Sequence, residues 1–171
     1  MQRLAAFAPL ALLAAAGPVD PATLLAGRYC EQFPNALVSG EKYTGENIVE
    51  IVPIAPRAAY VRLNLDFFNG HKCGIYGIAT AQGDALVYRE ASEPSPGERR
   101  CTLSIKRQGA KLAWDDDGGT CTAYCGARGK LSNSSIAYAS KRPIRYLPRL
   151  KASSQYRDAL TEWRTGKPVN P

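Results

Sequence analysis

Residues 59–80 read AYVRLNLDFFNGHKCGIYGIAT, and this stretch predicts the fold of the chain. As far as Phe67, polar and apolar side chains alternate, which gives an extended strand one apolar face. Asn69-Gly70 follows almost at once, and this dipeptide favours a tight hairpin because both residues accept a positive φ. Residues 72–80 then form the returning strand. The stretch therefore predicts two antiparallel strands joined by a short turn.

The same alternation, with frequent turns, continues on both sides of this hairpin. We expect further strands at 47–52, 85–90, 101–107, 111–114 and 120–124. The segments between them are turns or loops: Gly83-Asp84, the polar stretch 91–100, Gln108-Gly109 and 115–119. Short strands at such regular spacing favour a mainly β fold, a small antiparallel up-and-down barrel or sandwich of roughly seven or eight strands.

The end of the chain has a helical pattern instead. Apolar residues recur there at intervals of three and four, which is the stripe of an amphipathic α-helix: Ala152, Tyr156, Ala159, Leu160 and Trp163. Pro148 can occupy the first helical turn, and Gly166 and Pro168 end the pattern, so we expect one helix over 148–164. Its Tyr156, Leu160 and Trp163 side chains should pack on the barrel.

The first residues predict an export signal. Met1-Gln2-Arg3 carries one positive charge, residues 4–13 are apolar, and residues 14–17 are small, so we expect a signal peptide over 1–17. The alternative is an Ala-rich amphipathic helix that stays on the protein. Neither this stretch nor any later one is long enough to span a membrane. Residues 22–171 are then a single domain, and the expected location is periplasmic or secreted.

Export determines how the cysteines are interpreted, because an oxidising compartment favours disulfides over metal sites. Cys73 and Cys101 flank the 91–100 loop, so we expect them to pair, and Cys121 and Cys125 to close a local loop. Cys30, far from the others in sequence, is then free or pairs between molecules. A zinc site combining His71 with Cys73, Cys121 and Cys125 is a weaker alternative, and we expect no metal and no cofactor.

Positive charge is concentrated at the C-terminal end. Residues 22–140 carry 13 Lys+Arg and 12 Asp+Glu (13 − 12 = +1), whereas residues 141–171 carry 8 basic and 2 acidic residues (8 − 2 = +6), within a total of +7. Such a segment is attracted to polyanions such as phosphorylated glycolipid or anionic wall polymer. Nucleic acid is not the expected partner. The alternative is a solvated basic helix without a dedicated partner.

Two groups of residues are candidates for binding. In the segment 121–130, glycines and cysteines should hold Arg128 so that its planar guanidinium grips a carboxylate or phosphate, unless it forms an internal ion pair or caps carbonyls. Basic residues of the expected helix form the second group. The candidate binding residues are Tyr124, Gly126, Arg128, Lys130, Arg149, Lys151 and Arg157. No nucleophile motif accompanies His71, the only histidine, so we expect no catalytic residue.

The element Cys125-Gly126-Ala127-Arg128-Gly129 carries a resemblance to a protein group, together with Asn69-Gly70-His71-x-Cys73, Leu86-Val87-Tyr88-Arg89 and Cys101-x-Leu103. In these segments the chain resembles small exported proteins of Gram-negative bacteria, some of them related to periplasmic lysozyme inhibitors. The resemblance spans residues 60–135. One departure concerns charge: c-type lysozymes are basic, and a chain of +7 would be repelled by them.

These observations favour a non-enzymatic exported binding protein of the cell envelope that contacts an anionic component or a secreted or periplasmic protein. If that protein degrades the wall, the chain is an inhibitor or immunity factor. Two alternatives stay open: a small envelope-glycan hydrolase using two carboxylates, and a carrier with an apolar ligand inside the barrel. The sequence leaves the oligomeric state open.

Overall fold

A computed structural model describes residues 19–169, and its main feature is one antiparallel sheet of eight strands in sequence order. The predicted signal peptide at 1–17 lies outside the described residues. Each strand pairs with the next along the chain, which is the up-and-down arrangement that the sequence predicted. The strands are β1 (Gly27–Ala36), β2 (Lys42–Ala55), β3 (Ala58–Asp66), β4 (Lys72–Gln82), β5 (Ala85–Arg89), β6 (Thr102–Gln108), β7 (Lys111–Asp115) and β8 (Ser134–Ala137).

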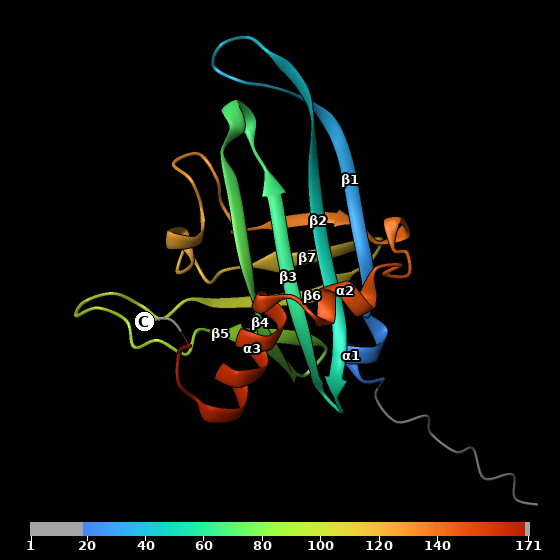
Figure 1. The fold of residues 1–171 in the computed structure, drawn as a ribbon, viewed down its shortest axis with the longest axis vertical. Helices are drawn as coiled ribbons and strands as arrows, with labels where there is room; N and C mark the ends of the chain where they lie inside the picture. Colours follow the sequence, from blue (N-terminus) through green and yellow to red (C-terminus); the bar gives the residue numbers. More distant parts are fainter. Residues whose placement is uncertain (1–18, 170–171) are drawn as a thin grey trace, which may run out of the picture.

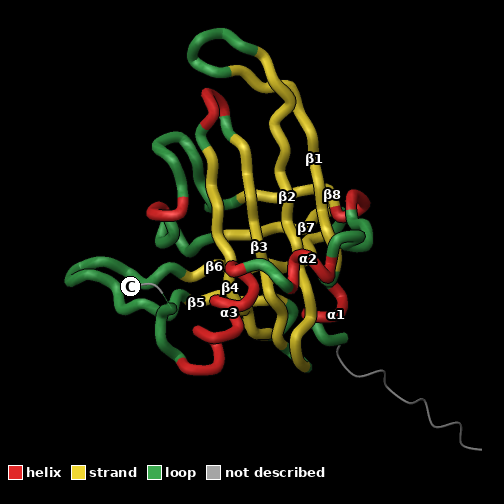
Figure 2. The backbone as a smooth tube through the Cα atoms, viewed as in Figure 1, coloured by secondary structure: helices red, strands yellow, loops and turns green. Residues whose placement is uncertain are grey.

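The sheet curves until its two ends almost meet, so the fold is a nearly closed barrel. Strands β1–β4 form one wall, and β5–β8 cross behind them (Figure 1, Figure 2). Arg28 in β1 exchanges two backbone hydrogen bonds with Arg142, each of 2.8 Å. The ring of Tyr29 lies 5.7 Å from that of Tyr138, in the 3₁₀ turn η3 (Tyr138–Ser140) after β8. These contacts close the seam between the first strand and the last.

The central hairpin follows the predicted alternation. Its register pairs Val61 with Gly77, and Leu63 with Ile75, which places the apolar face of β3 inside the barrel. The turn is the short 3₁₀ element η1 (Phe68–Gly70). Asn69 has a φ of 62° there, as expected of an Asn-Gly turn.

Side chains fill the barrel interior. Apolar residues from every strand form one continuous buried cluster, which includes Tyr29, Leu103 and Trp114. The short helix α1 (Pro21–Leu24) adds fully buried Ala22 to this cluster. The interior is therefore a packed core.

Two helices cover the outer face of β2–β4, where the sequence predicted one helix over 148–164 (Figure 1). These are α2 (Leu147–Lys151) and α3 (Ser154–Thr165). The chain breaks at Ser153, whose hydroxyl accepts a hydrogen bond from the Tyr156 amide and so starts a new helix. On the sheet side, Tyr156 and Ala159 pack against Tyr60 and neighbouring residues. Within residues 19–169 no helix is long and apolar enough to cross a bilayer.

The expectation that Trp163 would be buried is wrong. Tyr156 and Ala159 are buried, but Trp163 is 43% exposed. The reason is that a hollow separates the last turns of α3 from Ile78 of β4, Tyr88 of β5 and the 91–100 loop, so the indole does not pack on the sheet.

The expected strand at 120–124 is also wrong. Residues Thr122–Tyr124 form the 3₁₀ turn η2, and the last strand, β8, comes ten residues later. Hydrogen bonds that the Asp116 carboxylate accepts from the Gly119 and Cys121 amides, and a disulfide at Cys121, bend the chain here, so it cannot run on as an extended strand.

Candidate functional site

Four cysteines form disulfides, but both predicted pairings are wrong. The bonds are Cys73–Cys125 and Cys101–Cys121. Proximity in sequence misled the prediction, because η2 separates Cys121 from Cys125 and directs each toward a different strand. Cys125 pairs with Cys73 across an isolated β-bridge at the start of β4, and Cys121 lies 4.6 Å (Cα–Cα) from Cys101 at the start of β6. The loop over residues 116–133, called the disulfide loop below, is thus bonded to the barrel at two places.

Cys30 is unpaired, as the sequence predicted. Its thiol donates a hydrogen bond of 2.9 Å to Glu46 on the neighbouring strand β2. Burial and this carboxylate raise the pKa of the Cys30 thiol. A raised thiol pKa leaves less of the nucleophilic thiolate at neutral pH, which lowers the reactivity of Cys30.

Asp116 organises the disulfide loop from inside. Its side chain is only 1% exposed and accepts hydrogen bonds from the amides of Gly119 (3.1 Å) and Cys121 (3.3 Å). It also accepts one of 2.5 Å from the Ser132 hydroxyl, which ties the far end of the loop to its beginning. The aspartate run at 115–117 is therefore structural. Within the described part of the chain, no group of three or more His, Cys, Asp or Glu side chains could hold a metal ion.

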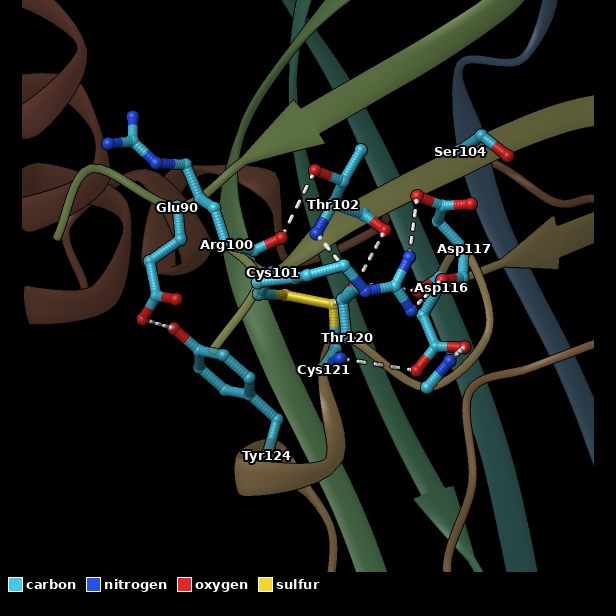
Figure 3. Close-up of a disulfide and its surroundings, with 12 residues drawn as sticks. Glu90, Arg100, Cys101, Thr102, Ser104, Asp116, Asp117, Thr120, Cys121 and Tyr124 are labelled. Carbon is cyan, nitrogen blue, oxygen red and sulfur yellow. Dashed lines mark hydrogen bonds and ion pairs between the residues drawn. A yellow bond between two sulfur atoms is a disulfide. The ribbon is translucent and has the colours of Figure 1, made fainter. Parts of the chain in front are cut away.

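The predicted binding residues of this loop divide into two kinds. The Tyr124 hydroxyl donates a hydrogen bond of 2.6 Å to Glu90, and the Gly126 amide donates one of 2.8 Å to the Lys72 carbonyl (Figure 3 shows the first). Both residues therefore hold the loop in place. Arg128 and Lys130 are exposed, and no carboxylate among residues 19–169 lies within 4 Å of either. These two cations are free to meet a partner.

The C-terminal segment carries a larger set of such cations. Seven are exposed, and no carboxylate within the described residues lies within 4 Å of any of them. One of the seven, Arg142, donates hydrogen bonds to the carbonyls of Ala139 and Lys141, which leaves six. Arg149 lies over the Tyr146 ring at 5.4 Å, and Arg157 donates a hydrogen bond to the Ala152 carbonyl. These contacts limit the motion of two of the predicted binding residues of this segment. We call the set the basic C-terminal surface: Arg145, Arg149, Lys151, Arg157, Arg164 and Lys167.

A buried ionic group connects this surface to the barrel. Glu50 of β2 is fully buried and forms an ion pair of 2.5 Å with Arg62 of β3. Glu50 also accepts a hydrogen bond from the hydroxyl of Tyr146, just before α2. Arg62 donates a further bond of 3.2 Å to Gln155 in α3. Because an uncompensated buried charge is costly, this group fixes both helices relative to the sheet.

The fold does not bring the two sets of candidate residues together. The disulfide loop joins β4 at Cys73, whereas α3 packs near Ile78 of the same strand. Five residues of strand span about 16 Å. Arg128 and Lys130 therefore belong to a different part of the surface from Arg149, Lys151 and Arg157.

A cleft that sequence reasoning missed lies between α3, the end of β5 and η2. It consists of two adjoining hollows of about 290 and 150 Å³. We call it the acidic cleft. The polar lining of its smaller hollow is Tyr76, Tyr88, Glu90, Ser92, Tyr124, Asp158 and Glu162, and the larger hollow adds Arg89, Glu93 and Arg100. The sequence did contain one signal for this cleft. Residues 141–171 carry only two acidic residues, Asp158 and Glu162, and their spacing of four places them on the same face of a helix.

Two hairpin tips carry exposed apolar side chains that the sequence analysis did not single out. The β1–β2 turn projects beyond the barrel, with the β3–β4 turn beside it (Figure 1). Val38 is 82% exposed and Phe68 62% exposed at these tips. The Asn35 side chain donates a hydrogen bond of 3.0 Å to the Phe67 carbonyl and so braces one tip against the other.

Comparison with known proteins gives no match to a family model, a curated protein or a solved structure. The resemblance to exported Gram-negative proteins thus depends on the motif residues alone. The two disulfides fit a protein that works outside the reducing cytoplasm.

Proposed function

We propose that this chain is a non-enzymatic periplasmic or secreted binding protein that docks on a phosphate-bearing anionic component of the cell envelope. The observation that carries the proposal is the basic C-terminal surface, with six exposed cations and no carboxylate within 4 Å among residues 19–169. Unpaired cations on one surface attract a polyanion over a range set by the ionic strength.

The way the surface is held supports this proposal. Segments that must become ordered on binding lose conformational entropy, whereas prearranged ones lose less. Here α2 and α3 are already packed on the sheet and linked to Glu50. Two of the arginines have side-chain contacts that limit their motion.

The packed interior supports an interaction protein over a carrier. A carrier needs an empty apolar chamber, but Tyr29, Leu103 and Trp114 occupy the centre of this barrel together with residues from every strand. A filled interior leaves the outer surface of the barrel available for binding.

Vesicle binding tests the proposal. Phosphatidylglycerol offers the same phosphate chemistry as phosphorylated glycolipids, so the full mature chain should co-sediment with phosphatidylglycerol-containing vesicles at low salt. Binding should weaken several-fold between 50 and 300 mM salt, and vesicles of phosphatidylcholine alone should bind little. Equal binding to both kinds of vesicle, or none to either, would contradict the proposal.

The projecting tips favour a second candidate function, inhibition of a wall-degrading enzyme or immunity to it. Val38 and Phe68 are apolar, exposed and convex, and such anchors fit a concave site on a protein. The positive charge of the chain selects for an acidic enzyme. In an assay of acidic wall hydrolases, the parent chain should inhibit the enzyme, and the double variant Val38→Asp/Phe68→Asp should not. Absence of inhibition by the parent chain would contradict this second function.

A further inference from the structure

A hollow of about 430 Å³ lies on the outer face of strands β6–β8, outside the basic C-terminal surface and the acidic cleft. Ile105 and Leu112 belong to the packed core, so the residues that alternate with them along β6 and β7 face outward. Ser104, Ala113 and Ser135 meet on this outer face, and Ala113 pairs directly with Ser135. Their short side chains form the floor of the hollow, which we call the polar groove.

One end of the polar groove is cationic. Lys106 and Lys111 line it, both are exposed, and no carboxylate within residues 19–169 lies within 4 Å of either ammonium group. The register pairs Lys106 with Ala113, two residues from Lys111, so the two lysines are diagonal neighbours on β6 and β7. Diagonal neighbours lie about 7–8 Å apart, so these two long side chains can reach one anion between them.

The other end offers hydrogen-bonding groups. Asp115, which pairs with Ser104 in the register, lines this end together with Asn133. The Asp115 carboxylate accepts hydrogen bonds from the amides of Asp117 (3.2 Å) and Asn133 (2.8 Å), one at each oxygen. Each carboxylate oxygen can accept a further hydrogen bond, and the Asn133 side chain can both donate and accept. This end therefore suits hydroxyl groups of a ligand.

A sugar that carries a carboxylate matches both ends. Its carboxylate suits two ammonium groups, and its hydroxyls, which donate and accept, suit the amide and carboxylate groups. Asp115 favours a singly charged carboxylate over a doubly charged phosphate, because its repulsion of the ligand grows with the charge of the ligand. The volume also fits, since sites for small molecules occupy about 300–1,000 Å³.

The polar groove faces away from the basic C-terminal surface. Helices α2 and α3 cover the outer face of β2–β4, whereas β6–β8 belong to the opposite wall of the barrel (Figure 1). A bilayer docked at the helices therefore does not reach Lys106 or Lys111, and the groove stays open to a second partner.

We propose that the polar groove binds an acidic saccharide, with the sugar carboxylate between Lys106 and Lys111. The ring lies along Ser135, and its hydroxyls meet Asp115 and Asn133. Carboxylated sugars occur both as uronic acids in polysaccharides and as N-acetylmuramic acid in wall glycan.

Titration calorimetry with two pairs of single sugars tests the proposal. Glucuronic acid differs from glucose, and N-acetylmuramic acid from N-acetylglucosamine, chiefly by a carboxylate. At least one acid should bind at millimolar concentration, and its neutral counterpart should bind at least tenfold more weakly. Lactate, a carboxylate without a sugar ring, should also bind at least tenfold more weakly. Equal binding of lactate or of the neutral sugar, or no binding of either acid, would overturn the proposal.

Charge-removing variants locate the site. Lys106→Gln with Lys111→Gln should weaken binding of the acidic sugar at least tenfold. The matched control, Lys42→Gln with Arg89→Gln, removes two exposed cations elsewhere and should leave binding unchanged. Equal losses in the two double variants would mean only a change in overall charge and would contradict the proposal.

A neutral substitution separates recognition of the sugar ring from attraction by charge. Ser135→Ala changes no charge and should weaken binding roughly two- to tenfold, the contribution of one hydrogen bond. Unchanged affinity would show that charge alone attracts the ligand and would contradict a saccharide site.

The source of the sugar follows from a comparison of the two acids. Tighter binding of glucuronic acid identifies a polysaccharide with uronic acids, and tighter binding of N-acetylmuramic acid identifies wall glycan. These tests are separate from that of the phosphate-bearing envelope component, because the probes carry no phosphate and every variant leaves the basic C-terminal surface unchanged.

Discussion

The disulfide loop and the C-terminal helices are both attached to the same barrel, but by different means. Two disulfides and the buried carboxylate of Asp116 hold the loop. Apolar packing on β2–β4 and the Glu50–Arg62 pair hold the helices. The loop should therefore depend on the redox state of its surroundings, whereas the position of the helices should depend on side-chain volume. The first four predictions below test this difference and the tyrosine at the cleft between the two regions.

The largest effect on stability should come from the disulfides. Cys73–Cys125 closes 52 residues and Cys101–Cys121 closes 20. Loop-closure entropy then gives about 4 kcal/mol for the first and about 3 kcal/mol for the second. Chemical denaturation of the Cys73→Ala/Cys125→Ala variant should show the greater loss. If the variant lacking the shorter link is the less stable of the two, chain entropy does not explain how the loop is held.

Tyr156→Ala should have the next effect, on the helices alone. The Tyr156 ring is 7% exposed and lies 4.9 Å from that of Tyr60. Removing a buried aromatic ring costs about 3 kcal/mol or more. Thermal unfolding should show this loss with both disulfides intact, and a melting temperature equal to that of the parent would show that α3 is not part of the folded unit.

Alkaline pH should affect the cleft between the two regions. Burial raises the pKa of Tyr88 to about 12, with the charges of Glu90 and Glu162 adding to the shift. The folded state thus favours the neutral phenol, so its contribution is complete below pH 10 and is lost as the pH rises toward 12. Two pKa units correspond to about 2–3 kcal/mol. Denaturant unfolding of Tyr88→Phe should depend less on pH over this range than unfolding of the parent, and parallel curves would contradict this assignment.

Trp163→Ala should have the smallest effect. A side chain that is 43% exposed over a hollow loses little packing on truncation, so we expect less than about 1 kcal/mol. The contrast with Tyr156→Ala, measured by the same thermal unfolding, is the informative quantity. Equal losses from the two variants would show that the helix packs along its whole length.

Much of the fold follows from local sequence signals. The alternation at 59–67 and the Asn69-Gly70 turn predicted the central hairpin, because burial on one face and a positive φ are local requirements. The Tyr156 stripe predicted a helix in the right place. The strand β8 escaped notice, since its four residues carry only one buried apolar side chain, Ile136.

The site was less predictable, because its properties depend on contacts between distant segments. Cys125 finds Cys73 across 52 residues, which no spacing rule indicates. Tyr124 looked like a binding residue but hydrogen-bonds to Glu90, 34 positions earlier. Trp163 lies on the correct helical stripe, yet a hollow separates it from the sheet. In each case the deciding partner lies in another part of the chain.

The central claim is that the basic C-terminal surface docks on an anionic partner, and charge removal tests it most directly. The measurement is the affinity for phosphatidylglycerol vesicles of Arg149→Gln/Lys151→Gln/Arg157→Gln, beside the matched control Lys42→Gln/Lys106→Gln/Lys111→Gln. All six side chains are exposed, so both triple variants should fold like the parent. Each cation near an anionic surface contributes about 1 kcal/mol, so the first variant should bind roughly 100-fold more weakly, and the control should change far less. Equal affinities for the two triple variants would contradict the claim.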